Sequence, residues 1–492
     1  MMRTIAPPIS PLRIILWLAV SLVSSTLLYA QTASRSELPA LRVTENNRFL
    51  EQADGQSFFW MGDTAWRLFA NLDSAQADQY LTHRKAQNFN VIQCSVIHGG
   101  ITETNAYGDS AFVNRDITAP NEAFWQYVDY VVRRAHDHGL YLAILPAWAR
   151  TYTETNHGDS ISKVLVHDTL AAYQYGRFLG NRYQDYSHLV WILGGDTWGT
   201  KDTIYRQLAR GLTNGGAPDT VLMTFHPKGG TYRPPATSSG EFYHDEPWLD
   251  FNMLQSGHRV GNRNFERIQE DYHRHPVKPT LDGEPCYEHH PVMHQYDSGE
   301  FYAYHLRRRG YWSVLAGAFG YTYGASGIYQ MSTPQRKGKV SHFKHYWYDA
   351  LDYEGANDMQ HLRRLFESRP FVRPARVPDQ TIVANPSDSI DFHLQAARAD
   401  DYSYWLVYFT SGSKQALDLS SAGDRSYQAW WYNPRDGKTY DSAGNPSNAP
   451  FREVAGQNVL FDPPGEQSLD NDWVLVLDEK SAKYPPPGTA LQ

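Results

Sequence analysis

The chain has 492 residues, of which 41% are hydrophobic, 14% aromatic and 20% charged. This composition supplies enough apolar material for a large core and too little charge for a disordered protein. The formal net charge is −8 and Lys and Arg residues form no long block, which argues against nucleic acid and an anionic membrane as partners.

The N-terminus has the pattern of a secretory signal. Arg3 and Arg13 precede a mostly apolar run over residues 14–28, and the small residue Ala30 stands before Gln31. A charged segment, a short apolar segment and a small residue at the cleavage site predict a signal peptide over residues 1–30. A membrane anchor is the alternative, but the run is near the lower limit for spanning a bilayer. We therefore expect a secreted or periplasmic protein with no stable membrane insertion after cleavage.

Residues 38–370 alternate between short apolar runs and longer amphipathic stretches, a pattern that predicts alternating strands and helices. Eight strands in an α/β fold predict a (β/α)8 TIM barrel, whose chemistry lies on the loops that leave the C-terminal ends of the strands. The predicted strands cover residues 58–61, 91–94, 140–145, 189–193, 221–225, 251–254, 280–281 and 319–323. The predicted helices cover residues 74–87, 121–138, 170–186, 205–214, 264–275 and 300–318.

The pattern changes after Pro370, where the apolar runs become short and are separated by Gly, Asp, Asn and Pro. Residues 371–482 are therefore expected to form a small C-terminal all-β sandwich domain. Its segment Asn433-Pro434-Arg435-Asp436-Gly437 predicts a hairpin, because Asp-Gly tolerates positive φ. The proline-rich tail at residues 485–488 is expected to be loose. Strands are predicted at residues 403–408, 428–432, 459–461 and 473–477.

The two cysteines, Cys94 and Cys286, are too few for a disulfide framework. They leave the second and seventh predicted strands, which are not neighbours around a barrel. We expect both to be free thiols.

Two carboxylates are predicted at the mouth of the barrel. Asp196 follows the fourth strand behind two glycines, and Glu284 follows the seventh strand. In this arrangement one carboxyl can protonate a leaving oxygen while the other attacks the sugar carbon, so the sequence predicts cleavage of a glycosidic bond. We expect the pKa of Asp196 to be raised by the Glu284 charge and by packing against Trp198. The alternative is that one carboxylate caps a helix or pairs with an arginine such as Arg309.

Other strand ends carry polar and aromatic side chains that suit a carbohydrate, whose hydroxyls need hydrogen bonds and whose C–H faces stack on rings. For each of them a structural place in the barrel is the alternative, for Trp66 in particular. The predicted substrate-binding residues are Asp63, Trp66, His98, Trp148, Trp198, His226, Gln255, His258, Glu288 and Tyr323.

We expect neither a metal nor another cofactor. His290 and His294 have a spacing that suits metal ligation, but Pro291 interrupts any helix there and no HExxH motif accompanies them. No Walker motif and no GxGxxG follows a strand, so a nucleotide has no evident binding place.

Several segments together resemble the apiosidase-like barrel of glycoside hydrolase family 140. They are Gly62-Asp63-Thr64-Ala65-Trp66, Phe89-Asn90-Val91-Ile92-Gln93, residues 191–196, His226-Pro227, Gln255-Ser256-Gly257-His258, Asp282-Gly283-Glu284-Pro285 and Tyr323-Gly324. Residues 431–437 and 472–478 resemble the β-sandwich that often follows this barrel and is labelled a collagen-binding domain.

The resemblance implies that Asp196 is the acid/base and Glu284 the nucleophile. It also implies that the substrate is a plant cell-wall polysaccharide or oligosaccharide, from which apiose-linked side chains of the pectin rhamnogalacturonan II are released. One departure is that Asp196 is followed by Thr197-Trp198, where the family more often carries Arg-Asn. This departure concerns the leaving-group side of the specificity and not the chemistry.

Two alternatives stay open. A related barrel glycosidase could act on another plant cell-wall sugar, because strand-end loops vary while the fold persists. A non-catalytic carbohydrate- or matrix-binding protein would need only the β domain, although carboxylates at both mouth positions speak against an inert barrel.

Overall fold

The computed structural model describes residues 38–100, 102–149, 166–198, 202–216, 221–229, 237–336 and 344–491. The predicted signal peptide, residues 1–30, lies outside the described residues, so secretion stays a prediction. Within the described residues, no helix has the length and apolar character needed to cross a membrane.

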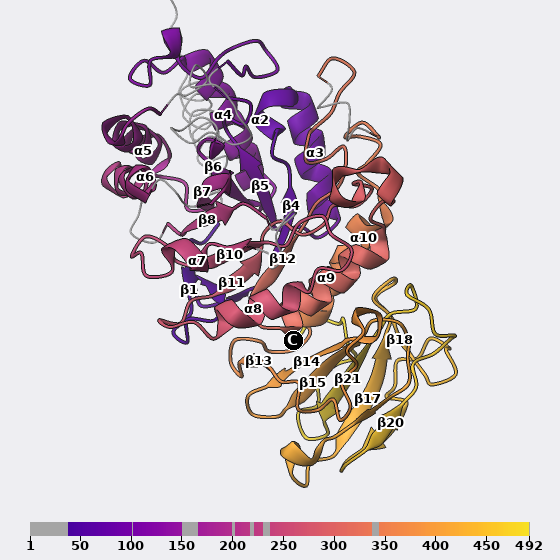
Figure 1. Ribbon diagram of the computed structural model, residues 1–492. Helices are drawn as coiled ribbons and strands as arrows, with labels where there is room; N and C mark the ends of the chain where they lie inside the picture. The colour runs from indigo at the N-terminus through magenta and orange to yellow at the C-terminus, as the bar shows by residue number, and fades with distance from the viewer. Residues whose placement is uncertain are drawn as a thin grey trace, which may run out of the picture. The chain divides into compact units, whose positions relative to one another are not determined.

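Eight parallel strands of the described chain form the barrel predicted from the sequence (Figure 1). The sheet runs in the order β8-β7-β6-β5-β4-β12-β11-β10, with the short strand β9 antiparallel to β10 at its end. Each predicted strand overlaps an observed one. The strands are β4 (Trp60–Thr64), β5 (Val91–Ser95), β6 (Tyr141–Leu145), β7 (Leu189–Thr197), β8 (Met223–Pro227), β9 (Thr237–Ser238), β10 (Asn252–Gln255), β11 (Thr280–Asp282) and β12 (Gly320–Tyr323).

The barrel closes between β8 and β10, where side chains supplement the backbone hydrogen bonds. The backbone N–H of Asp250 donates to the Met223 carbonyl (2.9 Å), and the Asp250 carboxylate accepts from the Met223 N–H (2.7 Å). One step further along, the Thr224 hydroxyl donates to the Phe251 carbonyl (2.7 Å). These contacts join the fifth and sixth barrel strands, so every strand end meets the same mouth.

Helices cover the outside of the barrel, and a small three-stranded sheet precedes it (Figure 1). All six predicted helices are present, with ends that differ by a few residues. The helices are α2 (Leu68–Asn71), α3 (Ser74–Ala86), α4 (Glu122–Asp137), α5 (Thr169–Tyr183), α6 (Asp202–Asn214), α7 (Gly240–Tyr243), α8 (Asn264–Tyr272), α9 (Ala303–Leu315) and α10 (Glu354–Glu367). The first sheet contains β1 (Leu41–Val43), β2 (Leu50–Gln52) and β3 (Ser57–Phe58), and short 3₁₀ turns lie at Val113–Arg115, Val292–His294 and Tyr296–Ser298.

Glycines let α5 and α6 approach each other backbone to backbone. A Cβ added at Gly211 would lie 2.3 Å from the Tyr173 carbonyl oxygen and 3.0 Å from the Gly176 Cα. Gly180 and Gly215 make the same kind of contact one turn further along. Because α6 follows the strand that carries Asp196, this close packing also fixes the support of the candidate site.

We expect Gly211→Ala to lower the free energy of unfolding by about 1–3 kcal/mol, because the helices must separate to admit the methyl group. This loss outweighs the gain in helix propensity of about 1 kcal/mol that Gly→Ala brings in a helix. Urea denaturation measures the difference. Gly261→Ala is the matched control, since a Cβ there meets open space. Equal midpoints for the two variants would contradict the observed helix packing.

The C-terminal domain is all-β and antiparallel, as predicted (Figure 1). One sheet has the order β13-β14-β15-β21-β17-β18 with β19 also paired to β17, and β16 pairs with β20 in a second sheet. The strands are β13 (Arg376–Pro378), β14 (Leu394–Ala399), β15 (Tyr404–Phe409), β16 (Gln415–Leu417), β17 (Tyr427–Tyr432), β18 (Thr439–Tyr440), β19 (Arg452–Val454), β20 (Val459–Phe461) and β21 (Trp473–Glu479). Further 3₁₀ turns lie at Ile390–Phe392 and Ser420–Ala422.

The larger sheet is buried on both faces, which explains the continuous apolar run of β15. Trp405, Val407 and Phe409 point into the core of the domain. Tyr408, on the opposite face, stacks on Tyr311 of α9 with ring centroids 4.8 Å apart. The β domain therefore packs directly against the outer helix layer of the barrel.

The predicted hairpin is present, and the predicted loose tail is not. Tyr432 pairs with Thr439, and Gly437 in the turn has φ +70°. The proline-rich tail instead packs onto the end of the barrel, where the Gly488 N–H donates to the Ser368 hydroxyl (3.0 Å). The expectation of a loose tail was wrong because a segment without periodicity can still be held by backbone hydrogen bonds.

Both cysteines are buried free thiols, as expected. Burial raises the pKa of the Cys286 thiol to about 11 and that of Cys94 still further. Neither thiol is therefore ionised at neutral pH.

Candidate active site

A bulge at the end of β7 presents Asp196 at the barrel mouth. Gly194 pairs with His226 of β8, but the next pairing is between Thr197 and Pro227, so Gly195 and Asp196 protrude from the ladder. The three successive residues from Gly194 to Asp196 have φ of +87°, +104° and +52°. Glycine adopts such angles readily, whereas Asp196 is held in the left-handed region. The Gly-Gly-Asp sequence is thus what makes this bulge possible.

The Trp148 side chain also requires a glycine at position 195. A Cβ at this position would lie 2.7 Å from the Trp148 indole. Trp148 follows β6 and lines the same cavity as Asp196. The bulge and the indole therefore occupy adjoining space with no room for a side chain between them.

Glu284 follows β11 and is held in place by the backbone of β10 and the residues after it. The N–H groups of Gly283 and Glu284 both approach the Leu254 carbonyl, at 2.8 and 3.3 Å. The Glu284 carbonyl in turn accepts from the Gly257 N–H (3.0 Å). With 6% of its surface exposed, Glu284 is a nearly buried carboxylate at a cavity wall.

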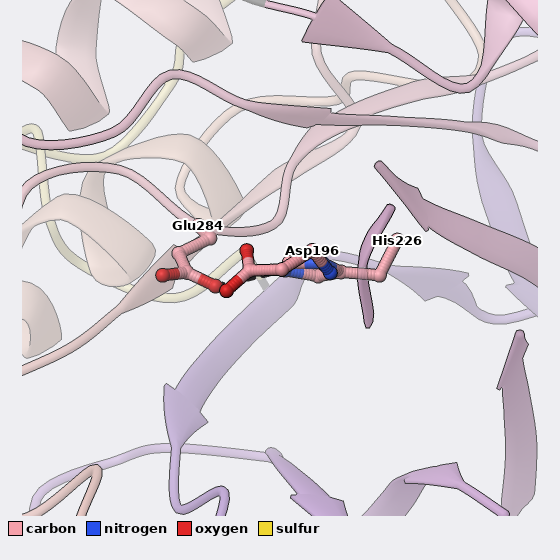
Figure 2. A group of neighbouring side chains, drawn as sticks. All are labelled: Asp196, His226 and Glu284. Carbon is pink, nitrogen blue, oxygen red and sulfur yellow. Dashed lines mark hydrogen bonds and ion pairs between the residues drawn. The ribbon is translucent and has the colours of Figure 1, made fainter. Parts of the chain in front are cut away.

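Asp196, His226 and Glu284 converge at the mouth (Figure 2). One carboxylate oxygen of Asp196, one ring nitrogen of His226 and one carboxylate oxygen of Glu284 all lie within 4.8 Å of one another. Carboxyl groups about 5–5.5 Å apart are typical of retaining glycosidases, whereas inverting enzymes need about 6.5–9.5 Å to admit a water. An oxygen of one carboxylate within 4.8 Å of an oxygen of the other fits the shorter range, and with it direct attack by one carboxylate.

The same three groups have the composition of a small metal site, and the hydrogen bonds of His226 bear on that possibility. The backbone N–H of Asp196 donates to Nδ1 of His226 (3.4 Å). A neutral imidazole that accepts at Nδ1 carries its proton on Nε2, the nitrogen that lies 2.9 Å from Glu284 Oε2. The nitrogen nearest the carboxylate therefore carries an N–H and not a lone pair. This arrangement fits a hydrogen-bond donor better than a metal ligand.

The carboxylates open into a small cavity of about 130 Å³. Drug-sized ligands occupy cavities of roughly 300–1,000 Å³, so this one has room for a single small ring. Its walls are aromatic and imidazole side chains, which offer faces for C–H stacking and nitrogens for hydrogen bonds. The lining residues are Trp66, His98, Trp148, Asp196, His258, Glu284, Tyr287, His290, His294 and Tyr329.

Burial raises the pKa of Asp196 to about 6, and the charge of Glu284 raises it further, while His226, Gln255 and Lys228 act in the opposite direction. The predicted direction is confirmed. The larger cause is burial and not Glu284, and Trp198 is 40% exposed beside Lys228, whose Nζ lies 5.4 Å from the centre of the indole ring. An aspartic acid with this pKa can donate a proton in mildly acidic solution.

We expect kcat/KM to fall about tenfold per pH unit above pH 6, because the ionised Asp196 cannot protonate a leaving group.

The raised pKa of Asp196 also affects the stability of the fold. The folded protein holds the Asp196 proton more tightly than the unfolded chain, so its ionisation lowers stability as pH rises from about 4 to 6.

Asp196→Asn should therefore raise the unfolding midpoint at pH 7.5 and leave it nearly unchanged at pH 3.5. Thermal unfolding at both pH values measures the difference. A variant that is equally destabilised at both would show that the Asp196 carboxyl is not held protonated by the fold.

Four of the ten predicted substrate-binding residues line the cavity: Trp66, His98, Trp148 and His258. The amide of Gln255 hydrogen-bonds Asp196, and its carbonyl accepts from the backbone of the loop that follows β8. Trp198 stands exposed at the end of β7. His226 is fully buried behind the two carboxylates, so it is not placed to touch substrate.

Three predicted residues are engaged elsewhere. Asp63 is fully buried and pairs with Arg84 of α3 (2.7 Å). The Tyr323 hydroxyl donates to Glu288 Oε2 (2.5 Å), and the other Glu288 oxygen accepts from the Gly355 N–H (2.9 Å). These side chains connect the strands to the outer helix layer and do not line the cavity, which corrects their predicted role in substrate binding.

Four lining residues were not predicted as substrate contacts: Tyr287, His290, His294 and Tyr329. In the sequence, His290 and His294 stand out only by a spacing that suits metal ligation. The rings of His258 and His290 stack 4.0 Å apart, and His294 meets both edge-on. Tyr287 lies three residues after Glu284, which is the one sequence signal that could have identified it. Tyr329 follows β12 in an irregular loop and carried no such signal.

Family models match both domains of the chain. The model of the apiosidase-like catalytic domain matches residues 44–373, and that of the collagen-binding domain of a collagenase matches residues 377–478. A solved structure described as a glycoside hydrolase is 32% identical with a TM-score of 0.80, and the match covers 90% of this chain and 97% of that one.

Two structures from Bacteroides vulgatus ATCC 8482 are also similar. One is a family 5 glycoside hydrolase, 29% identical with a TM-score of 0.80, where 91% of this chain and 96% of that one are covered. The other, a glycoside hydrolase at 13% identity and a TM-score of 0.63, shares the fold, with 91% and 83% covered. No curated protein sequence matches significantly.

Proposed function

Because the chain belongs to the family of apiosidase-like catalytic domains, we propose that it cleaves apiose-containing linkages in rhamnogalacturonan II, a plant pectin. The chain is a glycoside hydrolase; the sugar, the plant polysaccharide and a secreted or periplasmic location belong to the proposal. The observation that carries it is the pair of carboxyl groups, within 4.8 Å of each other, at a cavity sized for one small ring.

The geometry supports a retaining reaction in two steps. In the first, Glu284 attacks the anomeric carbon while Asp196 transfers its proton to the departing glycosidic oxygen, so the sugar becomes an ester of Glu284. In the second, the ionised Asp196 removes a proton from a water, which attacks the same carbon and releases Glu284 as a carboxylate. Two displacements at one carbon retain its configuration.

The cavity favours a pentose-sized terminal unit. Its volume of about 130 Å³ leaves little space for a second ring. The Trp66 and Trp148 rings, 5.0 Å apart and edge to face, form one wall on which the C–H face of a sugar can stack. The histidines that line the cavity can bond hydroxyls. Apiose, a branched five-carbon sugar in a furanose ring, fits these demands.

The test is a screen of the purified protein against defined pectic oligosaccharides, with detection of newly released apiose-terminated products. Release from apiose-linked substrates alone supports the proposal. Release only of another terminal sugar would keep the glycosidase and reject apiose. Tight binding without any product would favour the non-catalytic alternative.

The proposed location is tested separately. Expression of the full chain in a host with a periplasm, followed by N-terminal sequencing, should give a mature protein that begins at Gln31. Retention of residues 1–30 in the cytoplasm would reject secretion and leave the glycosidase assignment intact.

A further inference from the structure

We propose that His226 is a positioning residue that holds the proton donor and the nucleophile in their working arrangement, acting on each through a different ring nitrogen. The proposal rests on the proposed function, because it takes Asp196 as the donor and Glu284 as the nucleophile. It also replaces the role in substrate binding that the sequence suggested for this histidine.

The Nδ1 side of the ring supports the bulge. The hydrogen bond from the Asp196 N–H to Nδ1 (3.4 Å) joins the side chain of β8 to the protruding residue of β7. For a non-glycine residue, the backbone conformation at φ +52° costs about 1–3 kcal/mol of free energy. It is kept only when the surrounding structure holds it. His226 thus supplies a contact that keeps Asp196 directed at the mouth.

The Nε2 side of the ring faces the nucleophile. Nε2 lies 2.9 Å from Glu284 Oε2. The angle is not that of a well-formed hydrogen bond, and neither atom has another partner among the described residues. Two buried polar atoms at this distance are each other's available partner, and catalytic hydrogen bonds often tighten only when substrate is bound. The Nε2–H therefore stabilises the charge on Glu284.

The ring has little freedom to do anything else. Its neighbours are two indoles, with ring centroids at 5.2 Å for Trp66 and 5.5 Å for Trp148. His226 is fully buried, so substrate cannot compete for its nitrogens. A ring flip would turn Nε2 away from Glu284 and remove the acceptor from the Asp196 N–H.

Other groups also face Glu284 and are common to all His226 variants. Tyr287 hydrogen-bonds Glu284, and the Tyr287 oxygen accepts from the Trp66 indole N–H (3.0 Å). His258 Nε2 lies 3.9 Å from Glu284 Oε1, and the Asp196 carboxyl stands opposite. A difference in activity between His226 variants therefore reports what the ring itself contributes, because these groups are present in all of them.

Two substitutions separate the two functions of the ring. His226→Asn places an oxygen near Nδ1 and can still accept from the Asp196 N–H, but it cannot reach Glu284. His226→Gln places an N–H near Nε2 and can still donate to Glu284, but it offers no acceptor at the Nδ1 position. His188→Gln is the matched control, because His188 is equally buried and hydrogen-bonds Val132 in the helix layer.

For His226→Asn we expect the acidic limb of the kcat/KM profile to move to higher pH by about one unit, because the carboxylate loses a charged hydrogen bond. For His226→Gln the acidic limb should stay in place. The rate of His226→Gln should instead fall about 10²-fold on substrates with poor leaving groups and much less on substrates with activated ones, because the proton donor is displaced. His188→Gln should move neither limb.

Equal losses of kcat/KM in His226→Asn and His226→Gln, with the acidic limb unmoved in both, would overturn the proposal. His226 would then be a packing residue. A second measurement needs no substrate. In protein with ¹⁵N-labelled histidine, the His226 resonance, assigned by its loss in His226→Gln, should show a neutral ring protonated at Nε2. A ring protonated at Nδ1 would reject the proposal. If the wild type cleaves no apioside while this signature is present, the proposed substrate fails and the positioning role stands.

Discussion

Glu284→Ala is expected to be inactive on every glycoside, whereas Asp196→Ala should keep much of its rate on an aryl glycoside. A missing nucleophile cannot be replaced by any leaving group, because the covalent bond to the sugar is never formed. A phenolate that departs unaided has no need of the acid, whereas a sugar alkoxide does. General acid catalysis contributes about 10²–10⁴-fold, so Asp196→Ala should lose that much on the natural linkage. Steady-state rates on the two substrate types measure the contrast.

Glu453→Gln is the control for these variants. Glu453 of β19 makes an exposed pair with Lys480 in the β domain (2.9 Å), so its loss should leave both rates near those of the wild type. The role assignment is contradicted if the two active-site variants respond alike to leaving-group ability. Thermal unfolding of each variant confirms that the losses arise from chemistry and not from misfolding.

Arg307→Ala is expected to destabilise the whole protein by about 3–5 kcal/mol, because it leaves buried carboxylates without their counter-charge. Arg307 of α9 is fully buried and lies 2.7 Å from Asp358 of α10 and 2.9 Å from Asp472, beside β21. A third carboxylate, Asp470, approaches to 2.6 Å. One guanidinium therefore neutralises groups from both domains.

Denaturation in urea measures the effect, with Arg263→Ala as its control. Arg263 makes a surface pair with Glu266, which is worth no more than about 1 kcal/mol.

We also expect one cooperative unfolding transition for the wild type, since Arg307 and the stack of Tyr311 on Tyr408 couple the barrel and the β domain. Two separate transitions, with Arg307→Ala changing neither, would show that the domains are energetically independent.

The two carboxylates could be predicted because of a rule of topology. All strands of a barrel run in one direction, so residues at their C-terminal ends meet at one mouth even when they are far apart in sequence. Asp196 and Glu284 satisfy this rule, and the two glycines before Asp196 also indicated a special backbone. The C-terminal sandwich could be predicted from its alternating runs and its Asp-Gly turn.

The rule fails for strand-end residues that point away from the barrel axis. Side chains alternate between the two faces of a strand, so Asp63 and Tyr323 point to the helix layer, although Tyr323 ends β12 and Asp63 is the last residue but one of β4. Their partners, Arg84 and Glu288, come from other elements of the chain. Which face a strand-end residue takes depends on the last one or two residues of the strand, and those boundaries are the least certain part of a sequence-based assignment.

The role of His226 could not be predicted for a different reason. It depends on which proton the ring carries, and that follows from the Asp196 N–H, which reaches Nδ1 only because the bulge turns it there. The lining histidines His290 and His294 are a similar case. Their spacing bears only on a metal site, which the sequence disfavours, whereas in the structure both line the cavity and contact the His258 ring.

The most direct test of the central claim is to trap the sugar on the enzyme. An aryl 2-deoxy-2-fluoro-apioside should glycosylate the nucleophile quickly, and the resulting ester should hydrolyse slowly, because fluorine destabilises both transition states while the aryl leaving group speeds the first step. Peptide mass spectrometry should then find one sugar ester, on Glu284, and none in Glu284→Gln. An ester on another carboxylate, or turnover of the unfluorinated aryl apioside with inverted configuration and no ester, would contradict the account.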